Sequence, residues 1–183
     1  MRKTRFIVPL LALALLAPAG VRPAWAESND QLRRDAAAAL NSLCAGNSAA
    51  ALLRKKATAV LVFPHMLKAG FLFGGQVGDG VLFKGGRAAG TYNSVAASYG
   101  LQAGGQTFGY AMFFMNKGAL SYLDSSDGWE VGVGPSVVVV DSGMAKSISS
   151  TTLSNDVYAF IFDQRGLMGG MGIQGSKITK IGE

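Results

Sequence analysis

Glycines spaced four residues apart inside apolar segments are the feature that most constrains how this chain folds. Residues 57–83 (ATAVLVFPHMLKAGFLFGGQVGDGVLF) join a β-branched apolar run to five glycines set among large apolar side chains. The segment GFLFGGQ at 70–76 is echoed by GLQAGGQ at 100–106 and, more loosely, by GLMGG at 166–170. Glycine weakens an ordinary strand and is used where a sheet coils sharply or another backbone packs close to it. The pattern therefore predicts a tightly curved sheet.

The N-terminal segment has the features of a secretory signal. Three basic residues within the first five precede an apolar stretch at 6–19, and Ala24-Trp25-Ala26 is an A-x-A cleavage pattern. An uncleaved anchor is the alternative, although the apolar stretch is shorter than the roughly 18–20 residues that cross a bilayer. We expect residues 1–26 to be removed and residues 27–183 to form one domain in the periplasm. Peripheral attachment to a membrane and export from the cell stay open.

Charge and composition exclude several classes of function. Most of the net charge of +6 leaves with the signal, after which 13 Lys and Arg face 11 Asp and Glu. Nucleic-acid binding is therefore not expected. A single cysteine, Cys44, excludes an intramolecular disulfide, and we interpret it as a small core residue of a helix. The one histidine, His65, has no Cys or His partner, so no metal site is expected.

Helical spacing is confined to the start of the mature chain. Leu32, Ala36, Leu40 and Leu43 recur on one face of a predicted helix at 28–43. A second helix is expected at 49–56, capped by Ser48. From residue 57 the apolar period changes to two, which indicates strands.

We expect eight to ten strands with several breaks. The predicted breaks are a turn or short helical connection at 64–68, turns at 78–80, 85–86 and 163–166, and an irregular loop or edge strand at 141–154. A short helix at 117–123 is predicted to be capped by Asn116. The predicted fold is α+β, with two N-terminal helices (27–56), a glycine-rich β core (57–183) and one short central helix. The core is expected to be a strongly curved antiparallel sheet or barrel-like.

A catalytic constellation cannot be assembled from these residues. There is no G-x-S-x-G motif around a serine, and no glycine run continues into G-K-[ST]. The acidic residues at 124–130 are interpreted as part of a solvated loop, and a calcium loop of the D-x-[DN]-x-[DN]-G type is absent. We expect a protein that is not an enzyme, with no catalytic residues, cofactor or metal.

Cations beside apolar segments are the remaining candidates for a binding site. They are Arg33, Arg34, Arg54, Lys55, Lys56 and Lys68. A helix with an apolar stripe and flanking cations can lie on an anionic membrane. Alternatively, the stripe packs on the sheet and the cations face water. The sequence leaves both open.

A series of ordered motifs resembles the bacterial branch of the SYLF domain family, a lipid-binding domain also described as actin-binding in fungal members. The motifs are AVLVFP at 59–64, KAGF at 68–71, GGxxGxG at 74–80, YGLQxG at 99–104, VGVGPS at 131–136 and GLMxGxxxQGSKI at 166–178. The resemblance implies binding of membrane lipids, with phosphoinositides as the ligand in eukaryotic members. It carries a lipid-binding role to Arg33 and Arg34, on an amphipathic N-terminal segment, and to Lys68.

The chain departs from the family's pattern at two positions. Tyr92 stands where many members have tryptophan, and Asn93 stands where a proline often follows that tryptophan. Actin is not expected as a partner of a secreted bacterial protein. The expected function is non-enzymatic binding of anionic phospholipid or a membrane surface in the bacterial cell envelope. The alternatives are a small outer-membrane β-barrel and an envelope structural or stress scaffold without a specific ligand. The sequence identifies no protein partner.

Overall fold

The computed structural model describes residues 24–125, 129–130, 134–148, 153–168 and 176–183. Within them the chain forms four helices and six strands. The helices are α1 (Ala24–Gly46), α2 (Ser48–Lys56), α3 (Lys117–Ser125) and α4 (Ser142–Ser147). The strands are β1 (Ala59–Lys84), β2 (Arg87–Phe114), β3 (Trp129–Glu130), β4 (Val137–Val139), β5 (Val157–Met168) and β6 (Lys177–Gly182). Most of the predicted signal, residues 1–23, lies outside the described part, and the predicted cleavage point falls in the first turn of α1.

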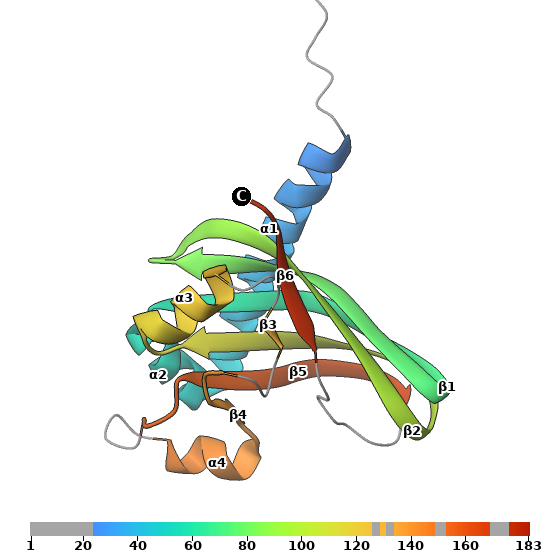
Figure 1. Ribbon diagram of the computed structural model, residues 1–183. Helices are drawn as coiled ribbons and strands as arrows, with labels where there is room; N and C mark the ends of the chain where they lie inside the picture. Colours follow the sequence, from blue (N-terminus) through green and yellow to red (C-terminus); the bar gives the residue numbers. More distant parts are fainter. Residues whose placement is uncertain (1–23, 126–128, 131–133, 149–152, 169–175) are drawn as a thin grey trace, which may run out of the picture.

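One long hairpin, β1 with β2, organises the molecule (Figure 1). Its strands hold 26 and 28 residues and pair antiparallel from the Ala59–Phe114 end to the turn. The turn at Gly85 and Gly86, with φ of 57° and 79°, confirms the prediction, because two-residue hairpin turns of this kind need positive φ.

The turns predicted at 64–68 and 78–80 are wrong, because β1 continues through both. Pro64 is accommodated by a shift of register between Phe63 and Met66, which is how a strand tolerates a residue without an N–H. Among the described residues, β1 and β2 are therefore each longer than the predicted strands, whereas β3 and β4 are short.

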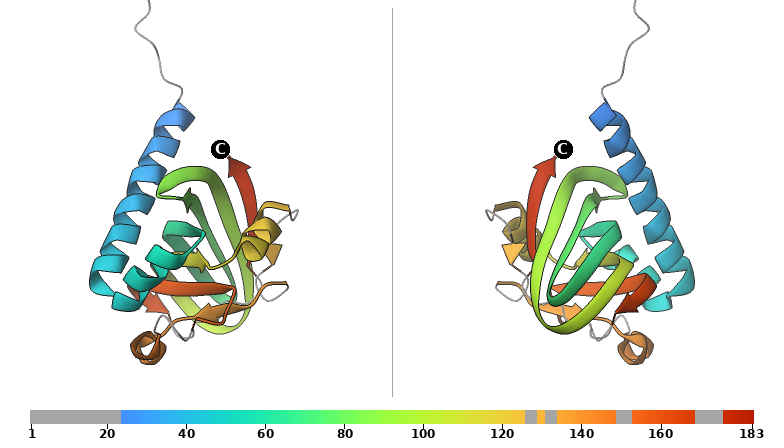
Figure 2. Two further views of the ribbon diagram at one scale, coloured as in Figure 1. Left: turned by 90° about the vertical axis from the view of Figure 1, so that its left-hand side faces the viewer. Right: turned by 90° about the vertical axis from the view of Figure 1, so that its right-hand side faces the viewer.

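The hairpin curls back on itself, and Figure 2 shows the curl as a U with α1 outside it. A Cβ atom added to Gly78 would lie 2.8 Å from the His65 carbonyl oxygen and would collide with the Met66 sulfur. One added to Gly80 would lie 2.6 Å from the Phe63 ring. Glycine therefore lets the two halves of β1 face each other at close range. The curvature predicted from the glycines is present, but the sheet does not close into a barrel.

The far edge of β2 carries the remaining strands, in the order β3-β6-β2-β5-β4. The pair β4–β5 is parallel, so the sheet is mixed and not antiparallel throughout. The turn predicted at 163–166 is wrong, because β5 runs on through Asp163, which has a φ of 51°. The loop or edge strand predicted at 141–154 is also wrong at its start, where Asp141 caps α4 by accepting a hydrogen bond from the Met144 N–H at 2.7 Å.

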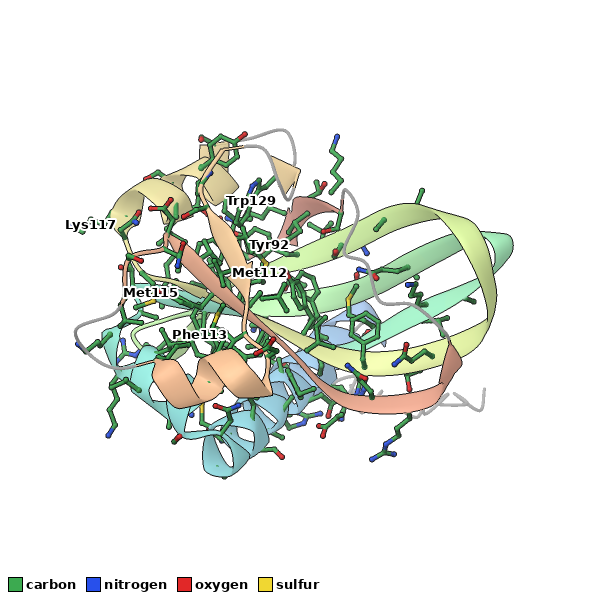
Figure 3. All side chains as sticks on the ribbon, turned by 90° about the horizontal axis from the view of Figure 1, so that it is seen from below. Tyr92, Met112, Phe113, Met115, Lys117 and Trp129 are labelled. Carbon is green, nitrogen blue, oxygen red and sulfur yellow. The ribbon has the colours of Figure 1, made fainter. Side chains whose placement is uncertain are left out.

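Two apolar clusters lie on opposite faces of the curved sheet. The outer cluster joins the apolar stripe of α1, including Ala36, Leu40 and Leu43, to the sheet. Of the two alternatives for that stripe, the structure shows packing on the sheet. The inner cluster lies within the curl and includes Tyr92, Met112 and Trp129 (Figure 3). Met112 and Phe113 are neighbours on β2 but belong to different clusters, as strand alternation requires.

The helix boundaries follow local capping chemistry. Asn47, not the predicted Ser48, caps α2 by accepting from the Ala50 N–H at 3.1 Å. The predicted cap of α3 is confirmed, because Asn116 accepts from the Ala119 N–H at 2.8 Å. In the described part of the chain, none of the helices is both long and apolar enough to cross a membrane.

Candidate functional site

The six predicted cations do not share one surface. Arg33 donates from Nη2 to the main-chain oxygen of Glu183 at 2.7 Å and lies 3.9 Å from Asp30. Arg34 donates from Nη2 to Gln31 Oε1 at 2.8 Å. Both arginines are thus engaged on the N-terminal half of α1. They are separate from the basic residues that end α2.

The structure brings Arg54 and Lys55 together on a groove of about 470 Å³ between α1, α2 and the β1–β2 turn. The groove is lined by Ala37, Leu40, Asn41, Arg54, Lys55, Ala57, Thr58, Ala59, Val60, Phe83, Gly85 and Gly86. None of these described lining residues is acidic. Leu40 and Val60 are buried at 3% and 5% exposure and give the groove an apolar floor. The arrangement offers two positive charges above apolar surface.

Arg54 is held in place by its neighbours on α1. It donates from Nη1 to Asn41 Oδ1 at 2.7 Å. It also lies beside Cys44, where burial raises the pKa of the thiol above its usual value and the Arg54 guanidinium partly opposes that rise. The thiol is therefore neutral near pH 7, as expected for a packing residue and not for a reactive one. Lys56 is exposed next to the groove, and all three cations stabilise the negative end of α2.

A second hollow, of about 380 Å³, lies between α1 and the bulged part of the sheet. Its lining includes Asp35 and Asp163 together with His65 and Arg165. The His65 Nε2 atom lies 4.0 Å from an Asp35 carboxylate oxygen, and the His65 side chain is 78% exposed. Two carboxylates oppose the cations here, so this hollow suits an anion less well than the groove between α1 and α2. No group of metal ligands is found among the described residues.

Lys68 lies in the interior and not on the surface with the other cations. Its exposure is 4%, and its cross-strand partner on β2 is Gln106, which is also buried. The lipid-binding role of Lys68 stays a prediction. The curl of the hairpin encloses the side chain, so it does not share a surface with the other five cations. The buried polar residues near it were not predicted. Two of them, Gln76 and Gln106, end the two GGQ echoes, which is the signal that could have identified them.

The exposed apolar side chains of the hairpin lie apart from the cations. Leu67, Val77 and Val95 are 46–51% exposed, and Val77 and Val95 are cross-strand partners. They face outward near the bend of the hairpin, which lies around Phe71–Phe73 of β1, and point away from the enclosed Lys68. The groove floor is therefore the apolar surface that the cations Arg54 and Lys55 can use.

No protein-family model matches the chain, and no curated protein matches it. The choice of ligand class therefore depends on the geometry of the groove and on the ordered motifs of the sequence. Chemically, the groove can bind an oxyanion through a guanidinium and an ammonium while apolar carbon packs beneath.

Proposed function

We propose that this protein is a non-enzymatic phospholipid-binding protein of the bacterial cell envelope. The observation that carries the proposal is the pairing of Arg54 and Lys55 above an apolar floor, with no acid among the groove's described lining residues. A phosphodiester headgroup can bind to such a charged pair, and the first carbons of its acyl chains can pack on such a floor. Arginine binds phosphate through parallel N–H donors, and lysine adds a compact charge.

The compartment follows from the predicted signal. After cleavage the chain would be in the periplasm, where it would attach peripherally to a membrane surface rich in anionic phospholipid. The resemblance to the SYLF domain supports the same ligand class. Because α1 packs its apolar stripe on the sheet, contact with lipid falls to the groove and to the exposed end of α2.

The expected strength is modest. Each Lys or Arg near an anionic membrane contributes about 1 kcal/mol. The pair therefore contributes about 2 kcal/mol, which corresponds to roughly a 30-fold change in affinity. Screening reduces this contribution as salt is raised, since the Debye length falls to about 3 Å at 1 M.

The test is co-sedimentation of the exported protein with vesicles of phosphatidylglycerol and phosphatidylethanolamine, compared with neutral phosphatidylcholine vesicles. We expect binding to the anionic vesicles, and about 30-fold weaker binding for the Arg54→Met/Lys55→Met variant. The matched control is Arg33→Met/Arg34→Met, which removes the same charge from α1 and should bind nearly as well as the wild type. Equal binding to neutral and anionic vesicles, or an equal loss in both variants, would contradict the proposal.

The scaffold alternative has its own outcome. If the folded Arg54→Met/Lys55→Met variant restores the phenotype of a deletion strain fully, lipid contact is not the function. A failure to restore it, with normal folding and abundance, supports the groove as the functional surface.

A further inference from the structure

The inner face of the curled hairpin changes from apolar to polar toward the bend. The polar residues there are Lys68, Gln76, Ser94, Gln106 and Ser176, with exposures of 4%, 8%, 0%, 7% and 1%. They come from β1, from β2 and from the residue that precedes β6. Buried polar groups of this kind need partners, because an amide or hydroxyl taken out of water without one costs free energy.

Strand register places these side chains on one face. Direct partners in an antiparallel pair point to the same side, and Lys68 pairs with Gln106. Gly78 pairs with Ser94, which in turn pairs with the inner-cluster residue Ile178. Gln76 lies two residues from Gly78, and Ser176 lies two residues from Ile178. Both therefore share that face.

The curl turns this face into two opposed walls. Gly80 lies against Phe63, and Gly78 lies against Met66. Two residues before Gly78, the next side chain on the same face is Gln76, which lies on one wall. Two residues after Met66, it is Lys68, which lies on the other wall. One wall thus carries Gln76, Ser94 and Ser176, and the opposite wall carries Lys68 and Gln106. The two GGQ echoes place one buried amide on each wall.

Several of these polar atoms lack hydrogen-bond partners. Among the described residues, Ser94 Oγ, Gln106 Oε1 and Ser176 Oγ are buried without one. The Tyr110 hydroxyl, further along the same face of β2, is also buried without a partner. Lys68 does have an interaction within the protein. Unpaired buried hydroxyls gathered from different strands are poor for stability and therefore point to a role in binding.

The charge of this region selects the ligand class. Of the acidic side chains whose exposure the structure describes, none is buried. Lys68 therefore gives this face a buried basic group, which suits an anionic ligand. The hydroxyls of Ser94 and Ser176 can donate to anionic oxygens, and Gln106 Oε1 needs a donor from the ligand.

We propose that the inner face of the hairpin is a second binding site, for an oxyanion that carries hydroxyl groups, of the glycerophosphate type. Lys68 and the two serine hydroxyls bind the phosphate oxygens, and Gln106 accepts a hydrogen bond from a ligand hydroxyl. This site is separate from the groove between α1 and α2 and does not require the membrane contact proposed there.

The test uses the side-chain amide signals of glutamines in NMR spectra of the exported protein. The probes are sn-glycerol 3-phosphate, inorganic phosphate, short-chain phosphatidylglycerol below its micelle concentration, and glycerol as the uncharged control. We expect saturable shifts of the Gln76 and Gln106 signals with glycerophosphate, no shift with glycerol, and no shift of exposed Gln31 on α1. A response to the short-chain lipid but not to glycerophosphate would assign the ligand to a lipid headgroup, and the reverse would assign it to a free metabolite. Saturation by inorganic phosphate alone would overturn the need for ligand hydroxyls.

A variant series decides whether Lys68 carries the binding. Lys68→Met keeps the length of the side chain and removes its charge. Because Lys68 has an interaction within the protein, the fold of the variant is first checked by circular dichroism. We expect at least a tenfold loss of affinity in Lys68→Met and no loss in Lys84→Met, which removes a half-buried lysine of the same strand that pairs with Asp124. If Lys68→Met does not fold, Ser94→Ala/Ser176→Ala takes its place with the same expectation.

The inference is overturned if no probe shifts Gln76 and Gln106 saturably, or if Lys68→Met responds like the wild type. The Arg54→Met/Lys55→Met variant should keep the glutamine shifts while losing vesicle binding, so the two proposals can fail independently.

Discussion

The groove between α1 and α2 and the inner face of the hairpin both combine basic residues with apolar surface, but they differ in burial. Arg54 and Lys55 are exposed, and they also stabilise the end of α2. Lys68 is 4% exposed, and the serines near it bury hydroxyls without partners. Exposed charges stay hydrated, so they cost little free energy on folding, and salt screens them. Enclosed polar groups lose their hydration and reduce stability unless something binds them. Folding and binding together therefore explain the charges of the groove, whereas folding alone does not explain the unpaired hydroxyls of the inner face.

We expect the largest effect from a substitution that separates the two walls of the inner face. Gly78→Ala places a methyl group 2.8 Å from the His65 carbonyl oxygen and against Met66, so the two halves of β1 must move apart. We expect a loss of about 2–3 kcal/mol in the free energy of unfolding, as overpacking typically causes. Urea unfolding followed by circular dichroism measures it.

The control for that substitution lies three residues earlier in the same strand. Gly75→Ala would bring its methyl group no closer than 3.9 Å to its nearest neighbour, the Ala96 carbonyl oxygen. It should change stability by less than about 0.5 kcal/mol. Vesicle binding through the groove should survive in both variants. Equal stability of the two variants would show that the walls do not pack as closely as described.

The parts of the fold that local chemistry decides could be predicted from the sequence. The helical spacing of Leu32 to Leu43, the Asn116 cap and the Gly85-Gly86 turn each depend on neighbouring residues alone. The turns expected at Pro64 and at Gly78 failed because the same residues serve a bulge and a close approach between distant backbones. Glycine and proline signal both uses, and only the tertiary contacts distinguish them.

The candidate sites, too, could be predicted only where they depend on residues that are neighbours in the sequence. Grouping Arg54 with Lys55 required only their adjacency on one helix, and the structure places both on the groove. Lys68 was grouped with them because of its charge, although the inward parity of β1 encloses it. That parity depends on the register shift between Phe63 and Met66, which is not readable from local sequence.

The loss of stability at alkaline pH tests whether water reaches the Tyr110 hydroxyl on the inner face. Burial raises the pKa of its phenol above the usual value near 10. The stability that depends on the neutral phenol is therefore complete below about pH 10 and is lost as pH rises above it. We expect Tyr110→Phe to remove up to about 1.4 kcal/mol per pH unit from this alkaline decline.

Unfolding in urea at pH 7, 10 and 11 makes that measurement. Part of the decline should remain in Tyr110→Phe, because burial and the hydrogen bond to Asp124 also raise the pKa of Tyr92. An unchanged alkaline slope in the variant would mean that water reaches the Tyr110 hydroxyl, and the inner face would then be wet and not a desolvated binding surface.

The last prediction concerns two serines: Ser136 is exposed and hydrogen-bonded, whereas Ser94 is buried without a described partner. Ser136 Oγ donates to Asp156 Oδ2 at 2.9 Å and accepts from the Asp156 N–H at 3.0 Å. The pKa of Asp156 is held below its usual value by the Ser136 backbone N–H, then by the Asn116 side chain, and then by the Ser136 hydroxyl. Ser136→Ala should therefore lower the free energy of unfolding by about 1 kcal/mol at neutral pH. Ser94→Ala removes a buried hydroxyl without a described partner and should raise it by about the same amount. Unfolding curves of the two variants, measured together, would show opposite displacements of the midpoint. A loss of stability in Ser94→Ala would mean that its hydroxyl is already satisfied within the protein, and the inner face would then lose its strongest reason for a ligand.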